Sequence, residues 1–146
     1  FTDFIGFTHL SENMDPELLL SNLEQLFTRF DEVSEQNEME RIKTIGDGYM
    51  AAGGISIQNE NTAVNAIKTG LQYLDVMHEF NKTQKESGLK PWKLRIGINT
   101  GQVIAGVIGL NKFAFDIWGS TVNLASRAES HGIMNRINIT ENTYNL

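Results

Sequence analysis

The sequence has no cysteine, only two prolines, and fewer basic than acidic residues. The absence of cysteine excludes disulfides, thiolate zinc sites and cysteine nucleophiles, so any metal must be held by oxygen or histidine. A formal net charge of −6 argues against a nucleic-acid-binding protein that relies on a broad basic surface. Apolar runs are a handful of residues long, far short of the roughly 20 that cross a bilayer, and no secretory signal opens the chain. We therefore expect no nucleic-acid partner, no membrane contact by this segment, and a cytoplasmic location.

The composition is that of one globular unit. Hydrophobic residues make up 40% and charged residues 21% of 146 positions, which is enough apolar material for one packed core. The chain contains no repeat, linker or low-complexity tract, so we predict a single domain over residues 1–146. It begins at Phe1 without a methionine and ends inside an apparent helix start, which leads us to expect a piece cut from a longer protein at both ends.

The longest early element is a helix. Asp15 followed by Pro16 is typical of a helix start, with a capping side chain first and proline at the first helical position. The apolar residues that follow recur at alternating spacings of four and three: Leu19, Leu23, Leu26, Phe30 and Val33. This pattern predicts a long amphipathic helix.

Two hairpins are predicted from alternation and turn residues. Residues 41–45 and 49–53 flank an Asp-Gly turn, which places Asp47 at the tip of a hairpin. Residues 93–99 alternate strictly between apolar and polar side chains and lead through a Thr-Gly turn into residues 102–108. We interpret this second pair as another hairpin, half buried.

The remaining elements complete an α+β pattern. Residues 62–81 carry an apolar stripe at helical spacing, and Ser120 or Thr121 can cap a third helix that runs to about residue 131. Residues 113–118 and 137–140 are predicted strands. Together these elements indicate an α+β sandwich whose mainly antiparallel sheet is covered by helices on one face.

Two carboxylates stand out. Asp3 ends an apolar strand and is followed by Gly6, Phe7 and Thr8, which lead toward a helix. A carboxylate beside free backbone amides suits a metal and a phosphate together. Asp47 lies at the predicted hairpin tip, and two carboxylates from separate strands are what a site for two magnesium ions requires. Taken singly, an aspartate before glycine is more often a turn residue than a ligand.

Four segments resemble, in order, the catalytic domain of the class III adenylyl and guanylyl cyclases. They read FTDFIGFTHLS, RIKTIGDGYMA, LRIGINTGQVIAGVIG and FDIWGSTVNLASRAES. The resemblance covers nearly the whole chain, from Phe1 to about Tyr144. It implies a ferredoxin-like α+β sandwich, and an enzyme that closes a nucleoside triphosphate into a 3′,5′-cyclic nucleotide with release of pyrophosphate.

The resemblance also implies metals and a purine. It makes Asp3 and Asp47 the ligands of two Mg²⁺ ions, replaceable by Mn²⁺, with the backbone carbonyl of Phe4 as a further ligand. Lys43 and Asp116 match the positions that select the purine. A lysine donates to the adenine N1 and an aspartate accepts from the exocyclic amine, whereas guanylyl members typically carry glutamate and cysteine there. We therefore expect ATP as substrate and cyclic AMP as product.

Asn123 and Arg127 are four residues apart on the predicted third helix and share one face. The resemblance makes them catalytic residues: Asn123 orients the ribose, and Arg127 stabilises charge on the α-phosphate. Arg95 matches a family arginine that approaches the triphosphate. In the family the metal aspartates come from one subunit and the purine selectors, asparagine and arginine from the other. This chain carries both sets, which implies a homodimer with two equivalent shared sites.

Alternatives remain open. The nearest is a guanylyl cyclase, or a cyclase of relaxed purine specificity. A non-catalytic nucleotide-binding or dimerisation module is the alternative from another class. A polymerase-like or diguanylate cyclase palm shares the logic of two metal ions, but the sequence has no GGDEF-type hairpin.

Overall fold

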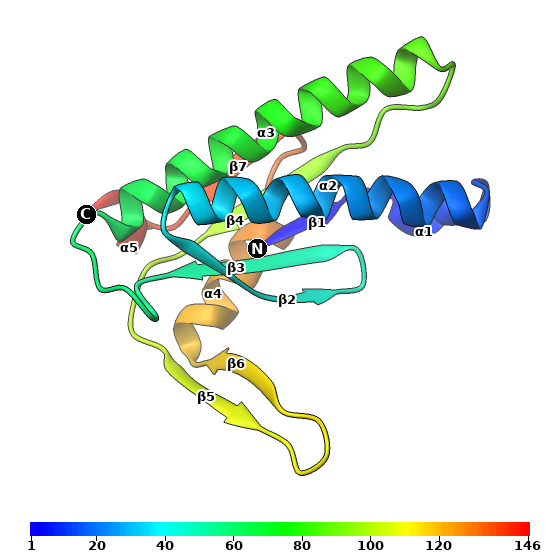
Figure 1. The fold of residues 1–146 in the computed structure, drawn as a ribbon. Coiled ribbons are helices and arrows are strands. Elements are labelled where there is room, and N and C mark those ends of the chain that lie inside the picture. Colours follow the sequence, from blue (N-terminus) through cyan, green and yellow to red (C-terminus); the bar gives the residue numbers. More distant parts are fainter.

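The computed structural model describes all residues from Phe1 to Leu146 (Figure 1). The helices are α1 (Phe7–Glu12), α2 (Pro16–Gln36), α3 (Thr62–Glu86), α4 (Ser120–Ser130) and α5 (Glu141–Tyr144). The strands are β1 (Thr2–Phe4), β2 (Met39–Ile45), β3 (Gly48–Gly53), β4 (Leu94–Ile98), β5 (Ile104–Ile108), β6 (Ala114–Trp118) and β7 (Arg136–Ile139). No helix combines the length and the apolar character needed to cross a bilayer.

The main sheet has five strands in the order β2-β3-β1-β4-β7. All neighbours are antiparallel except β4 and β7, so the predicted fold class is confirmed. The first hairpin is also confirmed, since Ile45 pairs with Gly48. Its two-residue loop is Gly46 and Asp47, one position earlier than predicted. Gly46 takes the left-handed conformation that the tight turn needs, with φ +60°.

The prediction of a second hairpin was wrong. Strand β4 lies between β1 and β7, while β5 pairs with β6 in a separate two-stranded sheet. Alternation within residues 93–99 shows that one face is buried but does not say which strand lies beside it. Leu94 and Ile96 are almost fully buried in β4, whereas β5 is largely exposed, so β4 is an inner strand of the sheet and β5 is not.

The two long helices cover one face of the sheet, as predicted (Figure 1). Phe30 of α2 stacks on Tyr73 of α3 at 4.2 Å between ring centroids, and both rings contact Tyr49 of β3. Asp15 caps α2 as expected, because its Oδ1 accepts hydrogen bonds from two backbone amides of the first turn. The apolar stripe of α2 therefore reaches the sheet at a fixed register.

Helix α4 packs against the opposite face, which the one-face description did not foresee. Gly97 of β4 makes this possible, because a Cβ there would lie 2.0 Å from the backbone nitrogen of Glu129. The predicted cap at Ser120 or Thr121 was wrong, since Gly119 occupies the N-cap position. The hydroxyl of Thr121 instead donates to the carbonyl of Gln102 at 2.6 Å. The sheet is thus covered on both faces around β4.

Candidate active site

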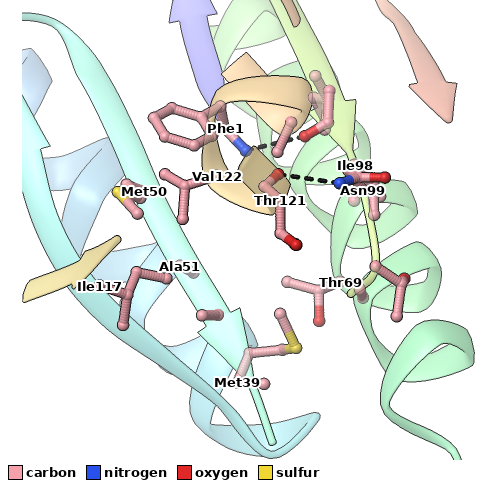
Figure 2. A pocket seen from close by; sticks show the side chains of 18 of the residues that line it. Phe1, Met39, Met50, Ala51, Thr69, Ile98, Asn99, Ile117, Thr121 and Val122 are labelled. Atoms are coloured by element: carbon pink, nitrogen blue, oxygen red, sulfur yellow. Dashed lines mark hydrogen bonds between the residues drawn. The ribbon is translucent and has the colours of Figure 1, made fainter. Parts of the chain in front are cut away.

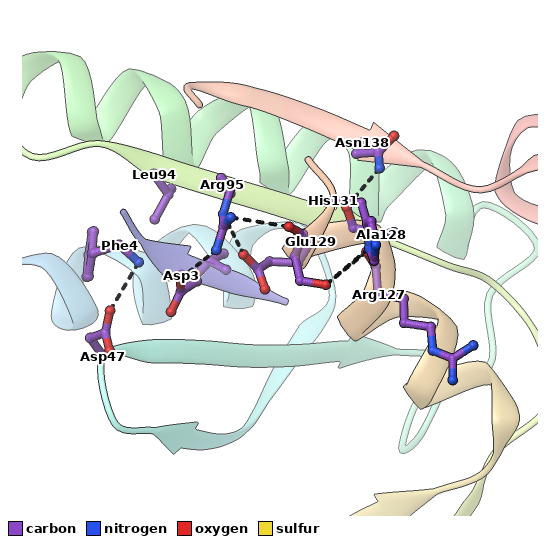
Figure 3. Close-up of polar contacts among 12 residues, drawn as sticks. Asp3, Phe4, Asp47, Leu94, Arg95, Arg127, Ala128, Glu129, His131 and Asn138 are labelled. Carbon is purple, nitrogen blue, oxygen red and sulfur yellow. Dashed lines mark hydrogen bonds and ion pairs between the residues drawn. The ribbon is translucent and has the colours of Figure 1, made fainter. Parts of the chain in front are cut away.

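Asp3 and Asp47 are brought together by strand pairing. Asp3 lies in β1, and Asp47 lies in the loop between β2 and β3, whose hairpin pairs with β1 at Thr2 and Tyr49. The backbone amide of Phe4 donates to Asp47 Oδ2 at 3.2 Å (Figure 3). Burial raises the pKa of Asp47, and the negative charge of Asp3 raises it further. The two carboxylates therefore lie next to each other, although they come from different elements.

This pair fits a divalent cation. Carboxylate oxygens are the hard ligands that Mg²⁺ and Mn²⁺ prefer, and two acids that repel each other are stabilised by a cation between them. The chain has no group of three or more histidine, aspartate or glutamate side chains placed to hold a metal ion together. A cation bound here would have to take its other ligands from backbone, water or substrate oxygens.

Arg95 lies between two acids on the face opposite the core (Figure 3). Its Nη2 donates to Asp3 Oδ2 at 3.0 Å, and its Nε lies 3.0 Å from Glu129 Oε1. Its Nη1 donates to the carbonyl of Ser130 at 3.2 Å. The alternation of β4 placed Arg95 correctly on the non-core face, and its expected contact with a triphosphate stays a prediction.

Glu129 is the site residue that the sequence did not reveal. It lies in the last turn of α4 and is 8% exposed, the most buried acid of the chain. Burial raises its pKa, and Arg95 opposes that shift. The signal for it was Gly97, because the missing side chain lets the backbone of α4 approach β4 beside Arg95.

The segment after β1 offers mainly backbone groups. Gly6 precedes α1 with φ +73°, so the chain turns sharply between Asp3 and this short helix. The ring of Phe7 packs against Trp92 at 6.0 Å, which leaves the backbone amide of Phe7 as its free polar group. Thr8 is exposed. The expected phosphate contacts of Gly6, Phe7 and Thr8 stay predictions.

Lys43 and Asp116, the two predicted purine-selecting residues, contact each other directly. Their contact with a purine stays a prediction. Lys43 Nζ donates to Asp116 Oδ2 at 2.5 Å, which joins β2 to β6. The backbone amide of Ile117 donates to the other carboxylate oxygen at 2.8 Å. The hydrogen bond from Lys43 lowers the pKa of Asp116, so the aspartate is a charged acceptor. Both side chains remain partly exposed, 41% for Lys43 and 20% for Asp116.

Asn123 and Arg127 lie one turn apart on α4, and both are exposed. Arg127 points away from the group formed by Asp3, Asp47 and Arg95 (Figure 3). None of the ion pairs of the chain uses Arg127. The predicted site residues therefore fall into separate groups within one chain, and Arg127 does not reach the carboxylate pair.

A cavity of about 140 Å³ lies away from these groups, between β3, β4, α3 and α4 (Figure 2). Its walls include Ala51, Thr69, Ile98 and Thr121, and none of the predicted site residues lines it. Phe1 and Thr2, at the start of β1, also line it, between β3 and β4. This cavity is a feature of the sheet rather than the candidate site.

The ribbon of β5 and β6 exposes large apolar side chains. Ile108 is 64% exposed, Leu110 94% and Phe113 78%. A two-stranded ribbon has little stability of its own, and a contiguous apolar surface usually marks an interaction site. The ribbon carries Asp116, so a surface suited to a partner adjoins a predicted site residue.

The whole chain matches one family. The description "Adenylate and Guanylate cyclase catalytic domain" fits residues 1–146. The chain belongs to this family, and it is a nucleotide cyclase catalytic domain.

Named relatives include both purine specificities. Adenylate cyclase type 9 of Xenopus laevis is 34% identical over 143 residues, which are 98% of this chain and 11% of the relative. Guanylate cyclase soluble subunit alpha-1 of Bos taurus is 33% identical over 146 residues, which are 100% of this chain and 20% of the relative. The chain thus spans a small part of the relatives it matches.

Solved structures agree with the fold. The adenylyl cyclase CyaB from P. aeruginosa superposes with a TM-score of 0.92 at 32% identity, over 99% of this chain and 76% of that one. The catalytic core of a rhodopsin-guanylyl cyclase with converted specificity, in complex with ATPαS, superposes with a TM-score of 0.88 at 31% identity. That match covers 99% of this chain and 76% of the other. Overall similarity to known cyclases therefore does not indicate whether this chain prefers ATP or GTP.

Proposed function

We propose that this cyclase domain is an adenylate cyclase, a phosphorus-oxygen lyase that converts ATP into 3′,5′-cyclic AMP and pyrophosphate. The observation that carries the proposal is the 2.5 Å contact between Lys43 and Asp116. A cationic donor and an anionic acceptor held side by side match adenine, whose N1 accepts and whose exocyclic amine donates. Guanine presents the opposite pattern at these atoms, so the same pair would leave unmatched groups.

The carboxylates provide for metal. Asp3 and Asp47, with the backbone of Phe4, would hold Mg²⁺ or Mn²⁺. When bound, the ions would supply Lewis-acid activation of the ribose 3′-hydroxyl and neutralise charge on the departing pyrophosphate. No protein nucleophile is required.

The helix α4 would serve the reacting centre. Asn123 would orient the ribose through its amide, and Arg127 would offset the charge that builds on the α-phosphate during attack. Both side chains are exposed, and Arg127 makes no ion pair within the chain. Asn123 and Arg127 are therefore free to bind a ligand, even though they do not reach the carboxylate pair of their own chain.

We further propose that two copies of the chain form a homodimer with two shared sites. The support is the placement of Arg127 away from Asp3 and Asp47, and the apolar ribbon of β5 and β6. A cytosolic location stays a prediction.

The test is a cyclisation assay with ATP and GTP, each with Mg²⁺ and with Mn²⁺. We expect cyclic AMP to be the main product in both metals. A preference for GTP would overturn the roles of Lys43 and Asp116 and support the alternative, a guanylate cyclase, which is also represented among the relatives, at 33% identity against 34%.

A metal-site variant separates catalysis from mere binding. Asp47→Ala is expected to abolish cyclisation, because it removes one of two carboxylate ligands. Asp75→Ala, on the exposed face of α3, is the control that should retain full activity. Unchanged activity in Asp47→Ala would rule out the two-metal mechanism. A chain that binds ATP but never cyclises it would be the non-catalytic module.

A further inference from the structure

Arg95 is held by two carboxylates on two edges of its guanidinium group (Figure 3). From β1, Asp3 accepts a hydrogen bond from Nη2 at 3.0 Å. From α4, Glu129 Oε1 lies 3.0 Å from Nε in an ion pair that lacks hydrogen-bond geometry. Only 26% of the Arg95 side chain and 11% of the Glu129 side chain are exposed. The arginine is therefore fixed in place rather than mobile on the surface.

The charges in this cluster do not balance. Asp3, Asp47 and Glu129 contribute three acidic side chains, whereas Arg95, which pairs with Asp3 and Glu129, is the basic side chain among them. A divalent cation on Asp3 and Asp47 would supply the missing positive charge. It would also compete with Nη2 for Asp3 Oδ2, because both are cations that need the same oxygen. Glu129 lies on the other edge of the guanidinium and would keep its contact.

Glu129 occupies an unfavourable position for an acid. It lies in the last turn of α4, where the helix dipole disfavours negative charge. It is also buried, and a buried carboxylate is costly unless it is paired. The close approach at Gly97 holds it there. Neither helix stability nor solubility accounts for an acid at this position, whereas its contact with Arg95 does.

We propose that Arg95 neutralises Asp3 until a divalent ion binds there, and that Glu129 is the positioning residue that then holds Arg95 toward the triphosphate. The proposal rests on the carboxylate pair being the metal site of the proposed function. Release of Nη2 from Asp3 would free donors for phosphate oxygens, which the planar guanidinium meets well. Arg95 would thus change partner while Glu129 keeps it in position.

The first readout is Mn²⁺ binding to the nucleotide-free chain, which is measured from the electron paramagnetic resonance signal of the Mn²⁺ that stays free. Arg95→Met removes the competing cation and should tighten Mn²⁺ binding by about fivefold. Glu129→Gln leaves Asp3 as the only carboxylate of Arg95 and should weaken Mn²⁺ binding by a similar factor. Glu86→Gln, an exposed acid at the end of α3, should change nothing. Weaker Mn²⁺ binding in Arg95→Met would show that Arg95 does not compete with the metal for Asp3.

The second readout is a double-mutant cycle on the affinity for a non-hydrolysable ATP analogue. Glu129→Gln should weaken binding about tenfold in the wild-type background and leave it unchanged when Arg95 is already methionine. An equal loss in both backgrounds would overturn the positioning role, because Glu129 would then act without Arg95.

Folding and the proposed function are checked separately. Thermal unfolding monitors each variant, and Arg95→Lys, which keeps the charge but loses the Nε contact, replaces Arg95→Met if that variant is unfolded. Arg95→Lys should keep Mn²⁺ binding near the wild-type level but weaken the analogue. If the wild-type chain binds Mn²⁺ but forms no cyclic nucleotide, the proposed function fails, while the Mn²⁺ measurements still decide the inference.

Discussion

Single residues in this chain acquire their properties from one or two contacts. Lys43 and Asp116 are far apart in the sequence, yet they meet at 2.5 Å where β2 passes β6. That hydrogen bond lowers the pKa of Asp116. Asp116 therefore keeps its charge over a wider pH range than a free aspartate.

The lowered pKa of Asp116 makes a testable contribution to stability. A carboxylate whose pKa is depressed in the folded state stabilises the fold above its unfolded pKa of about 3.9, and this contribution is lost as the pH falls through the folded value. Because both side chains are partly exposed, we expect at most about 1 kcal/mol. Urea unfolding should show Asp116→Asn destabilised at neutral pH, with the difference from the wild type disappearing as the pH falls below the lowered pKa of Asp116.

The matched control for this measurement is Asp75→Asn, whose side chain is exposed on α3. It should show no such pH-dependent difference from the wild type. A constant difference between Asp116→Asn and the wild type at both pH values would mean that the contact with Lys43 does not set the stability of the folded carboxylate.

At the scale of elements, the site depends on how closely α4 lies on β4. Gly97 allows the contact, since a Cβ would lie 2.0 Å from Glu129 N and 2.6 Å from the carbonyl oxygen of Ala125. Both are backbone atoms of α4, so no side-chain rotation relieves the clash. The helix would have to move away from the sheet, and Glu129 would move with it.

Gly97→Ala should therefore destabilise the chain by about 3 kcal/mol, measured by denaturant unfolding. Gly106→Ala is the control, because its Cβ would have Trp118 Cζ3 as nearest neighbour at 3.6 Å, an ordinary contact. Equal stability of the two variants would show that α4 can shift without cost. That result would remove the physical reason for the position of Glu129.

The sequence predicted those parts of the fold that local rules govern. The cap at Asp15, the stripe of α2 and the hairpin bearing Asp47 follow from spacing and turn chemistry over a few residues, and the structure confirms them. The neighbours of β4 were missed because alternation does not encode which distant strand pairs with it. Glu129 was missed for the same reason, since its contact with Arg95 arises only when α4 meets β4.

At the scale of the whole molecule, the candidate site residues do not converge within one chain. The carboxylates Asp3 and Asp47 lie together, while Arg127 points elsewhere from α4. Exposed apolar side chains gather on the ribbon of β5 and β6. In the proposed homodimer, the carboxylates of one copy and Arg127 of the other would together complete each of two equivalent sites.

Mixing inactive variants tests this arrangement directly. Asp3→Ala and Arg127→Ala should each be inactive alone, because every site of each homodimer lacks one essential group. After mixing in equal amounts, half the dimers pair unlike chains, and in each of these one of the two sites is intact. Cyclic AMP formation should therefore recover to about a quarter of the wild-type rate.

The decisive control is a mixture of Asp3→Ala with Asp47→Ala. Both changes fall on the same side of a shared site, because the two carboxylates adjoin each other within one chain. Every site in that mixture carries one defect or the other, so pairing unlike chains restores nothing. Recovery in the first mixture and none in the second would establish that metal and phosphate groups come from different copies. If neither mixture regains activity, each chain completes its own site.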